Sequence, residues 1–285
     1  KIIELAKNSN CDAIHPGYGF LSENTAFAKA CEKAKIIFIG PHPEAIRLMG
    51  NKIESRNFVK NLDIPLIESY SGTVDELKTL APKLDYPVLI KAASGGGGKG
   101  MRIVVEPKNF QSALEATSRE AKNYFGDETV YVEKYLNSPR HIEVQILGDN
   151  HGNVVHLFER ECSLQRRHQK IIEEAPSPTL TDEIREKLTN DAIIIAKAIQ
   201  YNNAGTIEFI FDQNLNYYFL EMNTRIQVEH PVTELITGID IVEEQIRIAE
   251  GLPIRFLQND LKIKGHAIEA RVYAENPENN FLPSP

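Results

Sequence analysis

Residues 205–234 read GTIEFIFDQNLNYYFLEMNTRIQVEHPVTE, and two apolar segments in this stretch predict a β-hairpin. Residues 205–211 and 217–222 are rich in β-branched and aromatic side chains, and the polar link DQNLN between them is typical of a turn. Because side chains alternate along a strand, we expect Glu208 and Glu221 to lie nearly opposite one another, with Asn223 on the face of Glu221. The hairpin therefore places two carboxylates side by side.

Two adjacent carboxylates indicate a site for a divalent cation. Like charges paired on a sheet are destabilising, and burial raises the pKa of one carboxyl group sharply unless a cation lies between them. The oxygen ligands Glu208, Glu221 and Asn223 suit Mg²⁺, which completes its shell with phosphate and water. An exposed hairpin whose acids are simply solvated is the alternative. The metal is favoured because both strands are otherwise apolar and no basic residue alternates with the acids.

A glycine-rich connection lies within residues 86–104, YPVLIKAASGGGGKGMRIV. Gly95, Gly97 and Gly100 match G-x-G-x-x-G, but the next residues predict a strand, whereas the dinucleotide-binding motif requires a helix there. Lys99 precedes a glycine and not Ser or Thr, so the stretch is not a Walker loop. It predicts two strands joined by a flap whose backbone N–H groups approach a phosphate. A flexible hairpin without a ligand is the alternative.

The bulk properties indicate a globular protein with more than one core. The chain has 285 residues of ordinary composition, which predicts two or three domains or subdomains. Its net charge of −8 opposes binding to nucleic acid or to anionic lipid. No apolar run approaches the roughly 18–20 residues that span a bilayer. Cys11, Cys31 and Cys162 lie far apart without a C-x-x-C pair, which favours a reducing compartment.

The pattern along the chain predicts a series of compact units. Residues 1–40 alternate helix, strand, helix and strand, and the following segment predicts two helices that meet near Gly50. Thr73 and Glu76 form a capping box that opens an α+β unit of about 70 residues, which we expect to move as a lid. Beyond it, strands are predicted at residues 141–149, 153–160 and 206–211, and a long helix at residues 182–200.

Seven stretches, in order, resemble the biotin carboxylases, a family of ATP-grasp enzymes. They are HPGYGFLSEN (15–24), FIGP (38–41), MGNK (49–52), IKAASGGGGKGMR (90–102), VEKYLNSPRHIEVQ (132–145), ERECSLQRRHQKIIEEAP (159–176) and EMNTRIQVEHPVTE (221–234). The resemblance implies an ATP-grasp fold of mixed α/β and α+β class. It assigns residues 1–50 to the C-terminal part of a Rossmann-like pre-ATP-grasp domain and 51–250 to the ATP-grasp domain, with a mobile lid at about 67–136. Residues 251–285 begin a C-terminal biotin carboxylase domain, and we expect the chain to be truncated at both ends.

The resemblance also implies an ATP site. Lys52 and Lys91 correspond to lysines on the phosphates, Gly97 and Gly98 to the flap above them, and residues 133–136 to the segment beside adenine. The full nucleotide set is Lys52, Lys91, Gly97, Gly98, Glu133, Lys134, Tyr135, Leu136, His141, Gln165, His168, Glu208 and Glu221. The family's metal ligands fall on Glu208, Glu221 and Asn223, in agreement with the hairpin argument, and bind Mg²⁺ or Mn²⁺.

A second set of residues corresponds to the family's carboxylation site. The resemblance places bicarbonate on Lys170, Arg225, Gln227 and Val228. A planar guanidinium can hold such an anion through two hydrogen bonds, which suits Arg225 to this role. Glu229 corresponds to the general base and Arg271 to the residue that stabilises the biotin enolate. The implied catalytic set is therefore Arg225, Glu229, Lys170 and Arg271.

The implied activity is the ATP- and bicarbonate-dependent carboxylation of biotin through carboxyphosphate. Its cofactors would be ATP, Mg²⁺ or Mn²⁺, and biotin on a separate carrier. Its partners would be a biotin carboxyl carrier domain, a carboxyltransferase from an acyl-CoA or pyruvate carboxylase, and a second copy in a homodimer, in the cytoplasm or the mitochondrial matrix. Two alternatives stay open: another ATP-grasp ligase with a different carboxylate acceptor, and a nucleotide-binding fragment without turnover.

Overall fold

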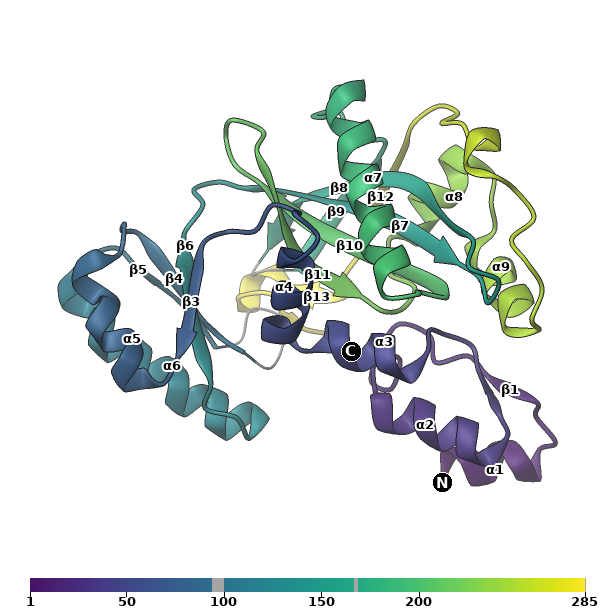
Figure 1. Cartoon of the computed structure of the whole chain (residues 1–285), viewed down its shortest axis with the longest axis horizontal. Helices are drawn as coiled ribbons and strands as arrows, with labels where there is room; N and C mark the ends of the chain where they lie inside the picture. The colour runs from purple at the N-terminus through teal and green to yellow at the C-terminus, as the bar shows by residue number, and fades with distance from the viewer. Residues whose placement is uncertain (94–99, 167–168, 285) are drawn as a thin grey trace.

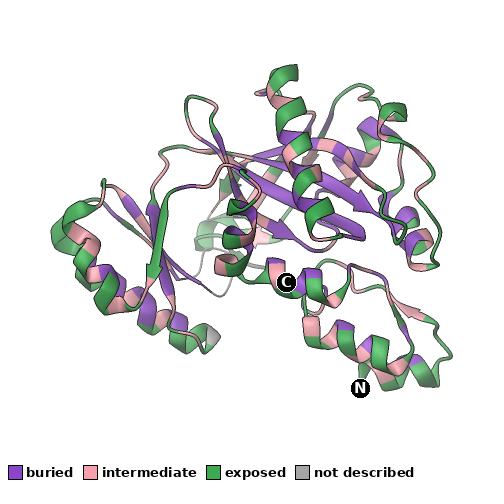
Figure 2. Cartoon of the chain, in the orientation of Figure 1, coloured by how far each residue is buried: buried purple, intermediate pink, exposed green. Residues whose placement is uncertain are grey.

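The chain forms an N-terminal α/β unit, a four-stranded sheet with two helices, and a larger six-stranded sheet (Figure 1). The structure, a computed structural model, describes residues 1–93, 100–166 and 169–284. Two central strands of the six-stranded sheet, residues 140–148 and 203–211, are buried along most of their length, whereas the helices expose one side (Figure 2). Within the described ranges, no helix has the length and apolarity needed to cross a membrane.

The N-terminal unit has the predicted alternation of helices and strands. Its elements are α1 (Ile2–Asn8), β1 (Ala13–Ile14), α2 (Thr25–Ala34), β2 (Ile37–Phe38), α3 (Pro43–Gly50) and α4 (Lys52–Lys60). β1 and β2 pair in parallel as a two-stranded sheet, and each has two residues. α3 ends at Gly50 and α4 starts at Lys52, which confirms the predicted junction. The side chain of Asn51 caps α4 by accepting hydrogen bonds from two backbone N–H groups.

The predicted α+β unit, called the lid below, is an antiparallel sheet covered by two helices. It comprises β3 (Ser69–Gly72), α5 (Val74–Leu80), β4 (Val88–Ala92), β5 (Met101–Val104), α6 (Phe110–Phe125) and β6 (Val130–Lys134), in the strand order β3-β6-β4-β5. β4 and β5 flank the glycine-rich stretch as antiparallel neighbours, so the predicted pair of strands is confirmed. The capping box of Thr73 and Glu76 is also confirmed. Leu77, Phe110 and Leu114 join the two helices to the core beneath them.

The six-stranded sheet carries most of the buried core. Its strands are β7 (Arg140–Gly148), β8 (Val154–Arg166), β9 (Gln169–Ala175), β10 (Asn203–Phe211), β11 (Tyr217–Asn223) and β12 (Ala267–Ala270), in the order β11-β10-β7-β8-β9-β12. Helix α7 (Asp182–Ala198) packs on one face, where Leu188 and Ile195 meet Ile142 and Val144 of β7. Since side chains alternate along β7, Glu143 and Gln145 point to the opposite face. That face holds the charged groups described below.

Four elements of this part differ from the sequence prediction. β8 continues to Arg166 and not to residue 160, and β9 was not predicted at all. The same holds for α8 (His230–Thr237) and α9 (Ile241–Ala249). Charged side chains that turn toward an internal cavity interrupt the apolar pattern of β8 and β9, which hides their strand character. Short elements complete the chain: β13 (Glu275–Asn276), β14 (Leu282–Pro283), and 3₁₀ helices at Ala81–Lys83, Pro107–Asn109, Gln258–Asp260 and Pro277–Asn279.

Candidate active site

One cavity of about 960 Å³ lies between the lid and the six-stranded sheet. It brings together every predicted site residue that falls within the described ranges. These are Lys52, Lys91, Glu133, Lys134, Tyr135, Leu136, His141, Gln165, Lys170, Glu208, Glu221, Asn223, Arg225, Gln227, Val228, Glu229 and Arg271. Gly97, Gly98 and His168 lie outside the described residues.

The end of the cavity at the lid is mainly apolar. Residues 133–136 leave β6 here, and the N–H of Tyr135 donates to the carbonyl of Pro87 at 3.1 Å. The apolar walls come from both sheets, and sequence reasoning did not identify them: Ile67, Leu89, Met101, Ile103, Ile210 and Leu220. An apolar space beside backbone groups suits an aromatic base.

Two lysines, Lys91 and Lys52, also line the cavity. Lys91 on β4 is buried and forms a close ion pair with the carboxylate of Glu133. Lys52 is the first residue of α4, and its Nζ lies 3.8 Å from Oε2 of Glu221. Lysine ammonium groups are well suited to phosphate oxygens, so this part of the cavity can receive a polyphosphate.

Charged residues form a row across four neighbouring strands. The register pairs Glu221 of β11 with Glu208 of β10, Glu208 with Glu143 of β7, and Glu143 with Arg160 of β8. The pairing of Glu208 with Glu221 confirms the predicted hairpin. Sequence reasoning missed Glu143 and Arg160, which are fully buried. Three carboxylates in a row on one face require compensating positive charge.

The outermost carboxylate pair fits a divalent cation. Burial, together with the negative charge of Glu208, raises the pKa of Glu221. Burial opposes ionisation of Glu208 as well, but Lys170 and His141 outweigh it and hold the pKa of Glu208 well below its usual range. Glu221 is therefore the member of the pair with less compensating charge, since among its causes only the more distant Lys52 and His141 act against burial and Glu208. The two carboxylates offer the hard oxygen ligands that Mg²⁺ prefers, whereas Asn223 turns its amide nitrogen to Glu208 and its Oδ1 to Arg225.

His141 and Asn223 both contact Glu208. Nε2 of His141 lies 2.6 Å from Oε2 of Glu208, and Nδ2 of Asn223 donates to Oε1 at 2.6 Å. Burial favours the neutral imidazole, but the carboxylate of Glu208 outweighs this and raises the pKa of His141. The raised pKa favours the charged form of His141 beside the carboxylates of Glu208 and Glu221.

Lys170 of β9 reaches the centre of the charged row. Its Nζ contacts Glu143, lies 3.0 Å from Oε1 of Glu208 and lies 2.6 Å from Oε1 of Glu229. Burial disfavours the charged ammonium, but these carboxylates outweigh burial and raise the pKa of Lys170 well above its usual value. A permanent cation therefore stands between the carboxylate pair and Glu229.

The loop after β11 presents an anion-binding group. Nη2 of Arg225 donates to Oδ1 of Asn223 at 2.9 Å, and Nε2 of Gln227 donates to Oε1 of Glu208 at 2.8 Å. The buried Arg160 fixes the side chain of Gln227, since Nη2 of Arg160 donates to Oε1 of Gln227 at 3.0 Å. These contacts fix the donors of Arg225 and Gln227 at the wall of the cavity.

Glu229 and Arg271 close the far end. Nη2 of Arg271 lies 2.9 Å from Oε2 of Glu229, and Nε of Arg271 donates to Oε1 of Glu173 at 2.6 Å. Burial raises the pKa of Glu229, but Lys170 and Arg160 outweigh it, so the pKa of Glu229 is lowered. Glu173 is fully buried in β9, and sequence reasoning missed it because it sat in an unpredicted strand. This end combines an ionised carboxylate with a guanidinium.

The lid, the segment at residues 133–136 and the carboxylate hairpin define an ATP-grasp protein. Residues 51–257 match the family described as carbamoyl-phosphate synthase L chain, ATP binding domain. Residues 1–46 match the family described as biotin carboxylase, N-terminal domain. Solved structures agree, because the chain superposes on the biotin carboxylase–β-γ-ATP complex from Campylobacter jejuni with a TM-score of 0.96 at 49% identity. That match covers 100% of this chain and 64% of the Campylobacter chain.

Curated relatives and a second solved structure identify the family within the ATP-grasp proteins. The chain is 56% identical to the mouse (Mus musculus) mitochondrial methylcrotonoyl-CoA carboxylase subunit alpha, over 99% of this chain and 40% of that protein. It is 53% identical to biotin carboxylase 2 of Bacillus subtilis, over 100% of this chain and 65% of that protein. It matches the biotin carboxylase domain of the Hydrogenobacter thermophilus 2-oxoglutarate carboxylase, bound to MgADP, ADP and bicarbonate, with a TM-score of 0.95 at 49% identity, over 99% and 63% of the two chains. The chain belongs to the biotin carboxylase family, and the predicted family and fold class are confirmed.

Proposed function

We propose that the protein carboxylates biotin at the expense of ATP and bicarbonate. One observation carries this proposal: Glu229 forms ion pairs with both Lys170 and Arg271. These three residues line the same cavity as the carboxylates of Glu208 and Glu221. An ionised base, two cations and a metal-binding pair in one cavity match the needs of a phosphoryl transfer to a small anion. The chain spans about 40% of the length of the first carboxylase relatives, so the activity is proposed for the whole protein.

The nucleotide binds with its base in the apolar end of the cavity and its phosphates toward the six-stranded sheet. The base would lie beside residues 133–136, that is Glu133, Lys134, Tyr135 and Leu136. Gln165 and His141, which line the same cavity, would complete its surroundings. Lys91 and Lys52 then neutralise charge on the phosphates. Gly97, Gly98 and His168 belong to the same proposal on the basis of the family resemblance.

Glu208, Glu221 and Asn223 would hold Mg²⁺ or Mn²⁺. When bound, the ion neutralises the polyphosphate and the developing charge of phosphoryl transfer. The raised pKa of Glu221 supports this assignment, because a carboxylate left with excess negative charge gains most from a cation.

Bicarbonate binds on Arg225, Gln227, Lys170 and the backbone of Val228. Arg225 orients the anion for in-line attack. Glu229 accepts the bicarbonate proton, and Lys170 and Arg160 keep Glu229 ionised for this role. The bicarbonate oxygen forms a bond to the γ-phosphorus, the bond to the β-phosphate oxygen breaks, and ADP and carboxyphosphate result.

Arg271 serves the second half of the reaction. Carboxyphosphate separates into CO₂ and phosphate, and the phosphate takes the N1 proton of biotin. Arg271 then meets the negative charge on the ureido oxygen while N1 bonds to the carbon of CO₂. Closure of the lid excludes water from the labile intermediate.

The domain boundaries and the partners are part of the same proposal. We assign residues 1–50 to the pre-ATP-grasp domain, 51–250 to the ATP-grasp domain with its lid at about 67–136, and 251–285 to the start of the C-terminal domain. In the whole protein the partners are a biotin carboxyl carrier domain, a carboxyltransferase and a second copy, in the cytoplasm or the mitochondrial matrix.

Release of ADP tests the proposal. The protein is incubated with MgATP and free biotin, first with bicarbonate and then after bicarbonate has been rigorously removed. We expect turnover that requires bicarbonate and that Arg225→Ala abolishes. Turnover that is indifferent to bicarbonate selects a different carboxylate acceptor. MgATP binding without turnover selects a nucleotide-binding fragment.

A further inference from the structure

The carboxylate of Glu23 contacts the loop that carries Arg225, 202 residues further along the chain. Oε2 of Glu23 accepts a hydrogen bond from Nε of Arg225 at 2.9 Å, and Oε1 accepts one from the backbone N–H of Thr224 at 3.0 Å. One carboxylate therefore fixes both the backbone before Arg225 and the inner nitrogen of its guanidinium.

The remaining contacts of Arg225 leave donors for a ligand. Nη1 donates to the carbonyl of Ile226 at 3.2 Å, and Nη2 donates to Oδ1 of Asn223 at 2.9 Å. A guanidinium has five N–H groups, and these contacts, together with the one to Glu23, use three of them among the described residues. One N–H remains on each terminal nitrogen, and Arg225 lines the cavity. The guanidinium thus keeps a pair of donors for a planar anion.

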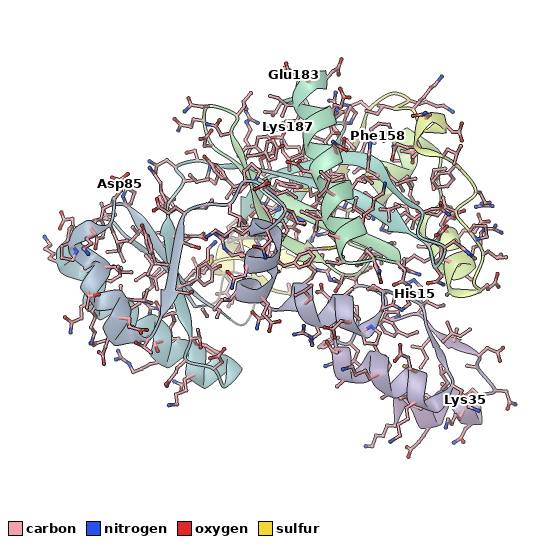
Figure 3. The ribbon with its side chains drawn as sticks, viewed as in Figure 1. His15, Lys35, Asp85, Phe158, Glu183 and Lys187 are labelled. Atoms are coloured by element: carbon pink, nitrogen blue, oxygen red, sulfur yellow. The ribbon has the colours of Figure 1, made fainter. Side chains whose placement is uncertain are left out.

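Glu23 itself is held by the N-terminal unit. It directly precedes Asn24, whose side chain caps α2 by accepting from the N–H of Phe27 at 2.8 Å. The N-terminal unit makes a second contact with the C-terminal part of the chain through His15, which Figure 3 places on the side that faces the six-stranded sheet. Nε2 of His15 lies 3.2 Å from Oε1 of Gln245 in α9. The cap of α2 and the contact of His15 therefore fix the position of the backbone that carries Glu23.

Arg225 needs this support because competing carboxylates line the same cavity. Glu208 and Glu221 both face the space that Arg225 borders. A guanidinium without its Nε anchor is free to turn toward these carboxylates, and it then no longer presents its outer N–H pair to an anion.

We propose that Glu23 is a positioning residue that holds the guanidinium of Arg225 in the orientation that binds bicarbonate. This inference rests on the proposed function. It makes the N-terminal unit part of the carboxylation site, since the side chain that orients Arg225 comes from the loop ahead of α2.

Steady-state kinetics of Glu23→Gln test the inference. Loss of a charge-assisted hydrogen bond is expected to raise the KM for bicarbonate by about tenfold, while the KM for ATP stays within about twofold of the unmodified protein. Glu32→Gln is the matched control, because Glu32 is an exposed acid on α2 that faces no catalytic group. Glu23→Asp, which keeps the charge, is expected to restore part of the bicarbonate affinity.

A double-mutant cycle separates this role from a purely structural one. Arg225→Lys removes the Nε contact, so the effect of Glu23→Gln on the bicarbonate KM is expected to shrink to less than about twofold in that background. Equal effects in both backgrounds overturn the inference. So does a Glu23→Gln protein with an unchanged bicarbonate KM, and either result leaves the proposed function intact.

A direct probe of the contact does not depend on turnover. The Nε–H signal of Arg225 in a ¹⁵N spectrum is assigned by its loss in Arg225→Lys, and its hydrogen exchange is compared with that in Glu23→Gln. We expect a shifted signal with exchange at least about tenfold faster in Glu23→Gln. An unchanged signal overturns the inference. This test needs no turnover, so its result stands even if an absence of bicarbonate-dependent ADP release has already refuted the proposed function.

Discussion

Arg271 and Glu229 form an ion pair at the far end of the cavity, with Nη2 of Arg271 2.9 Å from Oε2 of Glu229. The other oxygen of Glu229 lies 2.6 Å from Nζ of Lys170, so one carboxylate bridges two cations. This arrangement keeps Glu229 ionised and holds Arg271 at the cavity without using all of its donors.

Replacement of Arg271 separates nucleotide binding from carboxylation. Arg271→Ala removes the donor that we propose for the negative charge on the ureido oxygen, and we expect biotin carboxylation to fall by about 100-fold or more. Binding of MgADP is expected to change by less than about twofold, because Arg271 contacts Glu229 and Glu173 and not the lysines of the phosphate region. Carboxybiotin formation and calorimetric titration with MgADP measure the two effects. Equal loss of both would place Arg271 in the nucleotide site instead.

Replacement of Glu221 tests the cation site. Glu221→Gln keeps the shape of the side chain but removes the charge that the ion would neutralise, so we expect the Mg²⁺ concentration for half-maximal activity to rise about tenfold or more. Binding of ADP without metal is expected to be unchanged or slightly tighter, since a negative charge near Lys52 is lost. Glu183→Gln is the control, because Glu183 is an exposed acid at the outer end of α7 (Figure 3) and is not among the residues that line the cavity. An unaltered Mg²⁺ dependence in Glu221→Gln contradicts the assignment.

The hairpin shows which part of the site was predictable from sequence. Glu208 and Glu221 belong to adjacent strands joined by a short turn, so alternation along each strand was enough to pair them. Glu143 belongs to the same row of charges, but its strand joins β10 through pairing between segments distant in sequence. Local periodicity carries no information about such pairing, and Glu143 was therefore missed.

The buried charges of β8 and β9 illustrate the second limit. Arg160 and Glu173 lie inside strands yet are fully buried, which is rare for charged residues. Their burial is possible because each meets a partner outside its own strand: Glu143 of β7 for Arg160, and Arg271, directly after β12, for Glu173. The family resemblance identified Arg271 and Lys170, whereas the residues that hold them followed only from the three-dimensional packing.

Gly148 at the end of β7 provides a test of the packing. A Cβ at this position would lie 2.1 Å from the carbonyl oxygen of Tyr201, which is backbone and cannot rotate away. Gly148→Ala is therefore expected to destabilise the protein by about 1–3 kcal/mol. Gly50→Ala is the control, because a Cβ there meets nothing within 4 Å and alanine is the better helix residue, with an expected gain of about 0.5 kcal/mol. Chemical denaturation of both variants measures the difference, and a neutral Gly148→Ala would contradict the close approach of Tyr201.

Glu161 predicts how stability depends on pH. Its carboxylate is buried in β8 and accepts from Arg140 at 2.8 Å, Ser163 at 2.9 Å, Ser177 at 2.6 Å and Thr179 at 2.7 Å. Burial raises the pKa of Glu161, but hydrogen bonds from Ser177, Thr179, Arg140 and Ser163 outweigh it, and the pKa is lowered. A carboxyl group whose pKa is lower in the folded state stabilises that state above its unfolded pKa, which is about 4.3, and loses the contribution as the pH falls through the folded value.

Glu161→Gln is therefore expected to cost about 1–3 kcal/mol at pH 7, since charge-assisted hydrogen bonds are lost. The difference between the two proteins should shrink as the pH falls below about 4.3, because Glu161 then becomes protonated in the unfolded chain and afterwards in the folded one. Urea unfolding at pH 7, 5 and 4 measures the difference, with Glu186→Gln on the exposed side of α7 as the control. A difference that widens toward acid pH would show that the carboxylate of Glu161 is not stabilised by its four hydrogen-bond donors.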